Sequence, residues 1–386
     1  MRKFYTAEAV TEGHPDKLCD QIADAILDVC LKQDEQSRVA CEVLATKGTI
    51  IVAGEITSTY EPDVFAVVRK VLSDVGYSSE GIAMDTFVHR QSPDIAGAVD
   101  TSKERREGVS DNQIDWFQGA GDQGVMIGYA CDETKQLMPM PVVLANRIVR
   151  ELSACRQSSY IQGILPDGKA QVTVEYENGK PVRLDSVVVS CQHMEEKSLK
   201  KLEAEIRKKV LQPALRPLPP DEETKIYINP SGRFVCGGLD ADTGLTGRKL
   251  MVDSYGSMVP HGGGAFSGKD CSKVDRSAAY MARYIAKNIV AAGLASKCQV
   301  SLAYAIGVAQ PVMVQVDTFG TGNVCADDCL ELAIPLVFGL TPKQIVDSLR
   351  LTRPIFRQTA AFGHFGRKEF PWERTDKVEA LRNAVI

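Results

Sequence analysis

The feature that most constrains this chain is a pattern that occurs three times. Long amphipathic helices are predicted to begin near Asp16, Val142 and Val274, at intervals of about 130 residues. Each is followed by two apolar strands that form a hairpin, and then by a second helix. The predicted hairpins span Val39–Thr57, Ala170–Ser190 and Gln299–Phe319. The predicted second helices span Pro62–Val75, Glu195–Val210 and Thr341–Leu349.

Repetition of one structural unit at a fixed interval indicates internal duplication. We therefore predict an α+β fold of three similar helix/β-hairpin domains related by pseudo-threefold symmetry. Two-sided apolar hairpins need helices on one face and another sheet or subunit on the other. The domains are predicted at residues 1–98, 119–232 and 233–386, with a charged segment at 99–118 and a proline-rich spacer at 212–222.

Charge and composition exclude several classes of partner. The 386 residues carry a net charge of −5, which argues against nucleic acid or an acidic membrane surface as a ligand. The chain has no run of eighteen apolar residues, and it begins with polar sequence rather than a signal core, so we expect a cytoplasmic protein. Its eleven cysteines include no Cys-x-x-Cys pair, which predicts reduced, mostly buried thiols.

A glycine-rich segment points to an anionic ligand. Four glycines lie between Gly262 and Gly268, and Lys269 follows them directly. Glycine lets main-chain N–H groups approach phosphate oxygens, and the first turn of a following helix adds further donors. We predict that this helix is capped by Ser272 and Asp275 in a capping box, with Lys269 and Lys273 bracketing its first turn.

Other short segments also combine glycine, acid and base. Taken singly, each is most simply a helix cap or a solvated turn. Together they favour a site for a polyphosphate and the metal ions that accompany it. These segments are Glu12–Lys17, Pro166–Lys169 and Asp242–Lys249.

Two familiar motifs compete with this interpretation. Residues 263–269 have the spacing of a Walker phosphate loop, but Asp270 stands where Ser or Thr is required, and no clear buried strand precedes the loop. His261 and the glycines after it are similar to an esterase oxyanion loop, yet the chain lacks a Gly-x-Ser-x-Gly elbow. A P-loop-like NTPase stays open as an alternative, and the esterase does not.

Three segments, Glu12–Lys17, Gly119–Gly124 and Gly262–Asp270, resemble in order and interval the S-adenosylmethionine synthetase (methionine adenosyltransferase) family. The resemblance runs over nearly the whole chain. It implies three similar α+β domains and the synthesis of S-adenosylmethionine from ATP and L-methionine. It also implies hydrolysis of tripolyphosphate, a homodimer or a homotetramer built as a dimer of dimers, and active sites between subunits.

The resemblance also implies roles for individual residues. It implies catalytic roles for His14, Lys169, Arg248 and Lys269. Contacts to ATP are implied for His14, Asp167, Gly168, Lys169, Arg233, Phe234, Asp242, Arg248, Lys249, Ala265 and Lys269. Contacts to methionine are implied for Glu55, Asp122, Asp242 and Lys273. Two Mg²⁺ ions per active site are implied at Asp16 and Asp275, and one K⁺ per subunit at Glu42.

This chain departs from the family pattern at one position and in one segment. Gly97 stands where many members carry a glutamine that contacts methionine, and the segment 99–118 is longer than the common form. We expect that segment to act as a mobile lid, with Trp116 or Phe117 able to close over the site. A second alternative from another class is a nucleotide-binding regulatory subunit that has lost catalysis.

Overall fold

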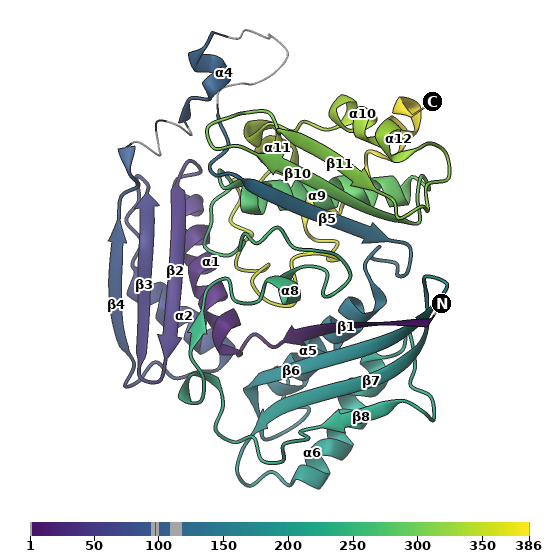
Figure 1. The fold of residues 1–386 in the computed structure, drawn as a ribbon. Helices are drawn as coiled ribbons and strands as arrows, with labels where there is room; N and C mark the ends of the chain where they lie inside the picture. The colour runs from purple at the N-terminus through teal and green to yellow at the C-terminus, as the bar shows by residue number, and fades with distance from the viewer. Residues whose placement is uncertain (1, 94–96, 98–99, 109–117, 386) are drawn as a thin grey trace.

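The computed structural model describes residues 2–93, 97, 100–108 and 118–385. Three sheets surround a common centre, and each has helices packed on one face (Figure 1). The predicted α+β fold of three similar helix and hairpin units is therefore confirmed. All three predicted hairpins form, and each follows a long helix.

The first sheet has the strand order β4-β3-β2-β9, and helices α1 and α2 pack with it. Strands β2 and β3 form the predicted hairpin, and β4 runs parallel to β3. The elements are α1 (Pro15–Gln33), β2 (Arg38–Thr46), β3 (Thr49–Thr57), α2 (Val64–Val75), β4 (Ala83–His89) and β9 (Gly244–Leu245).

The second sheet has the order β1-β6-β7-β8 and packs against α5. Its elements are β1 (Arg2–Val10), α5 (Met140–Gln157), β6 (Ile164–Glu177), β7 (Lys180–His193), α6 (Leu199–Ile206), α7 (Gln212–Ala214) and β8 (Lys225–Ile228). A π-helical turn, Arg207–Leu211, joins α6 to α7. The predicted second helix of this unit is thus interrupted and runs into the expected spacer.

The third sheet has the order β11-β10-β5 and packs against α9. Its elements are β5 (Gly124–Cys131), α8 (Leu250–Asp253), α9 (Val274–Ala291), β10 (Lys297–Tyr304) and β11 (Met313–Asp317). Three further helices complete the C-terminal part: α10 (Asp327–Val337), α11 (Pro342–Leu349) and α12 (Val378–Ala384).

The three sheets exchange strands in a ring. Strand β1, which precedes α1, pairs with β6 of the second sheet. Strand β5, which precedes α5, pairs with β10 of the third sheet, and the short β9, which precedes α9, pairs with β2 of the first. Each unit therefore lends one strand to its neighbour. The exchange brings residues far apart in the sequence to the centre of the molecule.

The start of α9 differs from the prediction. The helix begins at Val274, its cap residue Lys273 makes no side-chain capping bond, and the expected capping box is therefore wrong. Asp270 explains the difference, because its carboxylate accepts the main-chain N–H of Ser272 at 2.8 Å and pairs with Lys273. Lys269 and Lys273 consequently both precede the helix and do not bracket its first turn as predicted.

Part of the expected lid is described. Helix α4 (Lys103–Arg106) is short, and the Glu104 carboxylate accepts the main-chain N–H groups of Ala309 and Gln310 at 2.9 and 3.3 Å. Gly97 is exposed, and a side chain there would meet nothing within 4 Å. Trp116 and Phe117 lie outside the described residues, so closure by either stays a prediction.

The interior contains two hydrophobic clusters, one within the second unit and one shared by the first and third. All eleven cysteines are free, and eight are buried, which confirms the prediction of reduced thiols. Within the described residues, no single helix has the length and apolar character to cross a membrane, although the bent pair α10 and α11 satisfies the same criteria when taken together.

Candidate active site

The first predicted site residues lie where α1 begins. Pro15 occupies the first turn, as its fixed φ favours, and His14 is the cap residue. The His14 Nδ1 accepts the Asp16 main-chain N–H at 3.2 Å, so its own ring proton is on Nε2. Burial and the charges of Lys249 and Lys169 lower the pKa of His14 to about 3. The imidazole is therefore a neutral hydrogen-bond donor at physiological pH.

Cations gather on the carboxylate of Asp16. Lys249 Nζ lies 2.5 Å from Asp16 Oδ2, and Arg248 Nε lies 3.7 Å from Oδ1. Oδ1 also accepts the main-chain N–H of Leu245 at 3.0 Å. Burial opposes the negative charge, but the Lys249 and Leu245 hydrogen bonds outweigh it and lower the pKa of Asp16. Asp16 is therefore a buried carboxylate facing two positive side chains.

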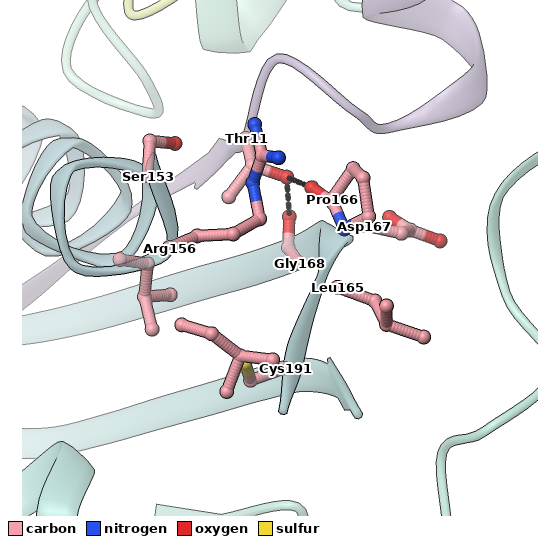
Figure 2. Close-up of a pocket in the computed structure, with 10 residues that line it drawn as sticks. Thr11, Ser153, Arg156, Leu165, Pro166, Asp167, Gly168 and Cys191 are labelled. Atoms are coloured by element: carbon pink, nitrogen blue, oxygen red, sulfur yellow. Dashed lines mark hydrogen bonds between the residues drawn. The ribbon is translucent and has the colours of Figure 1, made fainter. Parts of the chain in front are cut away.

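The irregular start of β6 at Asp167 closes another side of this group, where a turn was expected. Thr11 Oγ1 donates to the Pro166 carbonyl at 2.6 Å, which fixes this part of the strand (Figure 2). Asp167 Oδ2 accepts the Gly238 N–H at 2.9 Å, whereas its buried Oδ1 has no hydrogen-bond partner among the described residues. Burial raises the pKa of Asp167. An unpaired buried oxygen of this kind is suited to accept a hydrogen bond from a ligand.

The other residues of the group around His14 and Asp16 lie nearby. Gly168 and the exposed Lys169 follow Asp167 on β6, and Lys169 and Asp242 both act electrostatically on His14. Phe234 joins the end of β7, because its main-chain N–H donates to His193 Nε2 at 3.1 Å. Arg233 next to it forms an exposed ion pair with Glu195 at 2.6 Å.

The glycine-rich loop, residues 262–270, supplies a second group of charged side chains. Lys269 Nζ lies 2.6 Å from the Asp275 carboxylate, which projects from the first turn of α9. The exposed Glu42 on β2 lies near Lys269. A side chain at Gly247 would come within 2.6 Å of Ala265 Cβ, so the loop that carries Arg248 touches the loop that carries Lys269. The two groups thus adjoin within one chain.

The residues predicted to bind methionine are not all joined in the single chain. Asp122 is exposed and adjoins the glycine-rich segment, since the Gly121 N–H donates to the Ser272 carbonyl at 3.1 Å. Lys273 pairs with Asp270, and Glu55 on β3 lies 3.1 Å from His89. No contact among the described residues links Glu55 to Asp122 or Lys273.

Glu12 and Lys17, at the two ends of the segment Glu12–Lys17, contact residues outside the candidate site. Glu12 turns towards α5, where it accepts from Arg156 at 2.8 Å and also contacts Ser153. Lys17 is fully buried, and its Nζ lies 2.9 Å from Asp20 and 2.5 Å from Asp253. These contacts anchor the segment that carries His14 and Asp16.

The carboxylates fit a hard divalent ion held mainly by its substrate. Within the described part of the chain, no three histidine, cysteine or acidic side chains are grouped to hold a metal by themselves. Asp16 and Asp275 each offer carboxylate oxygens beside a lysine. Mg²⁺ keeps several waters and is usually bound through one or two carboxylates plus substrate phosphates. The donor set therefore suits Mg²⁺ accompanying a polyphosphate.

Sequence reasoning missed the residues that hold the two cation loops. Asp20 accepts the Gly247 N–H at 2.9 Å, and Asp24 accepts the Gly268 N–H at 2.8 Å. Both carboxylates are fully buried on α1. The available signal was the recurrence of aspartate every four residues along a helix whose other face is apolar.

The fold and the site define a three-unit enzyme that concentrates cations and carboxylates where its units meet. Models of the S-adenosylmethionine synthetase N-terminal, central and C-terminal domains match residues 2–99, 117–234 and 236–374. The chain belongs to the S-adenosylmethionine synthetase family. It is a transferase of S-adenosylmethionine biosynthesis, acting on ATP and methionine in a family that is generally metal-dependent. The two rival functions, the P-loop NTPase and the inactive regulatory subunit, are not favoured.

Proposed function

We propose that the group around Asp16 and the Lys269 loop provide the two halves of the site that transfers adenosyl to methionine. The methionine sulfur attacks the ribose C5′ of ATP. A C–S bond forms, the C5′–O bond breaks, and its electron pair leaves with the triphosphate, which is then hydrolysed to phosphate and pyrophosphate. A thioether has no proton to lose, so the nucleophile needs no general base.

The leaving group sets the catalytic task. Negative charge grows on the bridging oxygen as the C–O bond breaks, so the protein must supply fixed positive charge there. One cation at ~4 Å contributes roughly 4 kcal/mol at an effective dielectric near 20. Lys169, Arg248 and Lys269 are assigned this role, with Lys249 beside them. The cluster of Lys249 and Arg248 on buried Asp16 is the observation that carries the proposal.

His14 is assigned to the breaking bond itself. Because its Nδ1 is occupied by the Asp16 N–H, its Nε2–H is left to donate to the bridging oxygen. A neutral N–H group can donate a hydrogen bond to that oxygen without adding a positive charge to the site. The assignment is supported by the low pKa of His14, which keeps the ring neutral.

The remaining assignments concern substrates and ions. The free oxygen of Asp167 supports a contact to the nucleotide, shared with Gly168, Arg233, Phe234, Asp242 and Ala265. Methionine is assigned to Glu55, Asp122, Asp242 and Lys273, with Gly97 contributing no side chain. Asp16 and Asp275 would hold two Mg²⁺ ions, which neutralise phosphate charge, and Glu42 would hold one K⁺.

We also propose a homodimer or a dimer of dimers in the cytoplasm, with active sites between subunits. Each sheet exposes a large apolar residue on the face away from its helices. Phe4, Phe87 and Val125 are 48%, 63% and 42% exposed on β1, β4 and β5. A second copy would cover these faces, and it would bring Glu55 and Lys273 of different chains into one site.

The role of Lys269 is tested by Lys269→Met, which keeps most of the length of the side chain and removes its charge. We expect sulfonium formation to fall at least ~10²-fold, since one fixed cation is lost at the leaving group. Chromatography of S-adenosylmethionine measures the rate, and circular dichroism checks the fold. The matched control is Lys47→Met in the exposed turn between β2 and β3, which should retain full activity. Unchanged turnover in Lys269→Met would refute the assignment.

A further inference from the structure

A stripe of aspartates runs along one side of α1. Asp16, Asp20, Asp24 and Asp28 recur every four residues, a spacing that places side chains on the same face of a helix. Each carboxylate accepts a main-chain N–H from a segment outside the helix. Asp28 binds the N–H groups of Phe356 and Arg357, both at 2.9 Å. The other three bind the loops of the candidate active site.

Two of these contacts are alike in detail. Asp20 Oδ1 accepts the N–H of Gly247, and Asp24 Oδ1 accepts the N–H of Gly268. Both glycines have positive φ, +74° and +81°. Each is preceded by a hydroxyl residue and followed by a cation, in Thr246-Gly247-Arg248 and Ser267-Gly268-Lys269. One helix therefore holds the residue just before each of two cations assigned to the polyphosphate.

Each of the two aspartates forms an ion pair with a buried cation. Lys17 Nζ lies 2.9 Å from Asp20 and 2.5 Å from Asp253. Arg276 donates to both oxygens of Asp24, at 2.6 and 2.8 Å, and its guanidinium also donates to the Lys269 carbonyl at 3.1 Å. Ionised acceptors make stronger and better-aligned hydrogen bonds than neutral ones. Both carboxylates that anchor the loops thus have a cation and a main-chain N–H as partners.

The anchors matter because the side chains of both cations extend from the loops that the aspartates hold. The Arg248 side chain is 52% exposed and that of Lys269 is 22% exposed, and each lies beside one carboxylate, Asp16 or Asp275. Their main-chain positions then decide where the charges lie. A displacement of about 1 Å in a positioned catalytic group costs on the order of 10²-fold in rate.

We propose that Asp20 and Asp24 are positioning residues for adenosyl transfer. By fixing the N–H groups of Gly247 and Gly268 on one helix, they set where Arg248 and Lys269 stand relative to each other and to Asp16. The inference rests on the polyphosphate roles given to those two cations under the proposed function. It assigns no contact between the aspartates and the substrates.

Asp20 provides the sharper test, because its counterion Lys17 keeps Asp253 as a partner when Asp20 is replaced. Asp20→Ala leaves the Gly247 N–H without its acceptor. Asp20→Asn keeps an acceptor oxygen and removes the charge. Asp28→Ala is the matched control, because it removes a carboxylate from the same stripe that holds Phe356 and Arg357 instead of a cation loop.

Two readouts separate positioning from general damage. Binding of inorganic tripolyphosphate with Mg²⁺, measured by calorimetry on the full-length protein, reports on the cations directly. Steady-state kinetics gives kcat and the KM for methionine. We expect Asp20→Ala to weaken tripolyphosphate binding and lower kcat by about 10²-fold with the methionine KM unchanged. Asp20→Asn should recover most of both, and Asp28→Ala should match the wild type.

Other results would overturn the inference. Equal tripolyphosphate affinity and kcat in Asp20→Ala and Asp28→Ala would show that Asp20 is merely structural. Equal loss in Asp20→Asn and Asp20→Ala would show that the contact to Gly247 is not what matters. If Asp20→Ala does not fold, Asp20→Ser serves in its place, because its hydroxyl is one bond too short to reach Gly247. A wild type that binds no tripolyphosphate would instead refute the cation roles themselves, and the inference with them.

Discussion

At the scale of single residues, the pKa of an aspartate shifts in opposite directions in different surroundings. Asp16 has a lowered pKa because hydrogen bonds from Lys249 and Leu245 outweigh burial. Asp28 lies three turns along the same helix face, and burial raises its pKa to about 6 even though it accepts two main-chain N–H groups. The environment and not the residue type therefore decides which aspartate stays charged.

The raised pKa of Asp28 predicts a pH dependence of stability. Between its ordinary value of 3.8 and about 6, the folded protein binds a proton that the unfolded chain does not bind. The contribution of Asp28 to the free energy of unfolding is therefore fully present at low pH. It falls by up to about 3 kcal/mol as the pH rises through about 6. The stability of Asp28→Asn should not fall in this way as the pH rises. Urea unfolding midpoints of both proteins from pH 4 to pH 7 measure the difference, and parallel curves would contradict the account.

At the scale of elements, the periodic pattern predicted the helices and hairpins well. Long helices begin at or close to Asp16, Val142 and Val274 because each carries an uninterrupted apolar stripe. Local rules failed where a distant contact decides the conformation. Ser272 and Asp275 have the spacing of a capping box, yet Asp270 binds Ser272, and Lys269 binds Asp275. The anchors Asp20 and Asp24 were missed because their partners lie more than 200 residues away.

The glycine before Lys269 gives a prediction at this scale. Gly268 has a positive φ, and a side chain there would clash with the Cys41 carbonyl oxygen. Gly268→Ala should therefore lose about 3 kcal/mol or more, the sum of backbone strain and overpacking. Gly81→Ala is the control, because Gly81 has a similar φ of +74° but nothing within 4 Å of an added side chain. Its loss should be about 1–2 kcal/mol. Thermal unfolding compares them, and equal losses would exclude the clash.

At the scale of the whole molecule, the exchange of β1, β5 and β9 closes the three units into a ring. The repeat predicted three similar units, but no local pattern indicated which sheet each first strand would join. The same ring explains why the site gathers residues from α1, β6 and the loops before α9. No hydrogen bond or ion pair among the described residues joins Glu55 directly to Lys273, and the proposed site shared between subunits would join them.

The exposed sheet faces predict the behaviour of the assembly. Phe87→Asp places a charge on the open face of β4, so we expect sedimentation velocity to show a shift from dimer or tetramer towards monomer, with activity lost in parallel. Leu336→Asp is the control, since Leu336 is 77% exposed on α10 and belongs to none of the three sheets. An unchanged mass for Phe87→Asp would show that this face is not the interface.

The central claim is that the clustered cations take up a triphosphate expelled by the methionine sulfur. The most direct measurement supplies the purified protein with ATP, Mg²⁺ and K⁺ and records phosphate release with and without methionine. We predict that phosphate and pyrophosphate form in step with S-adenosylmethionine, and that release without methionine is a small fraction of that rate. Phosphate release at the full rate without methionine would contradict the account.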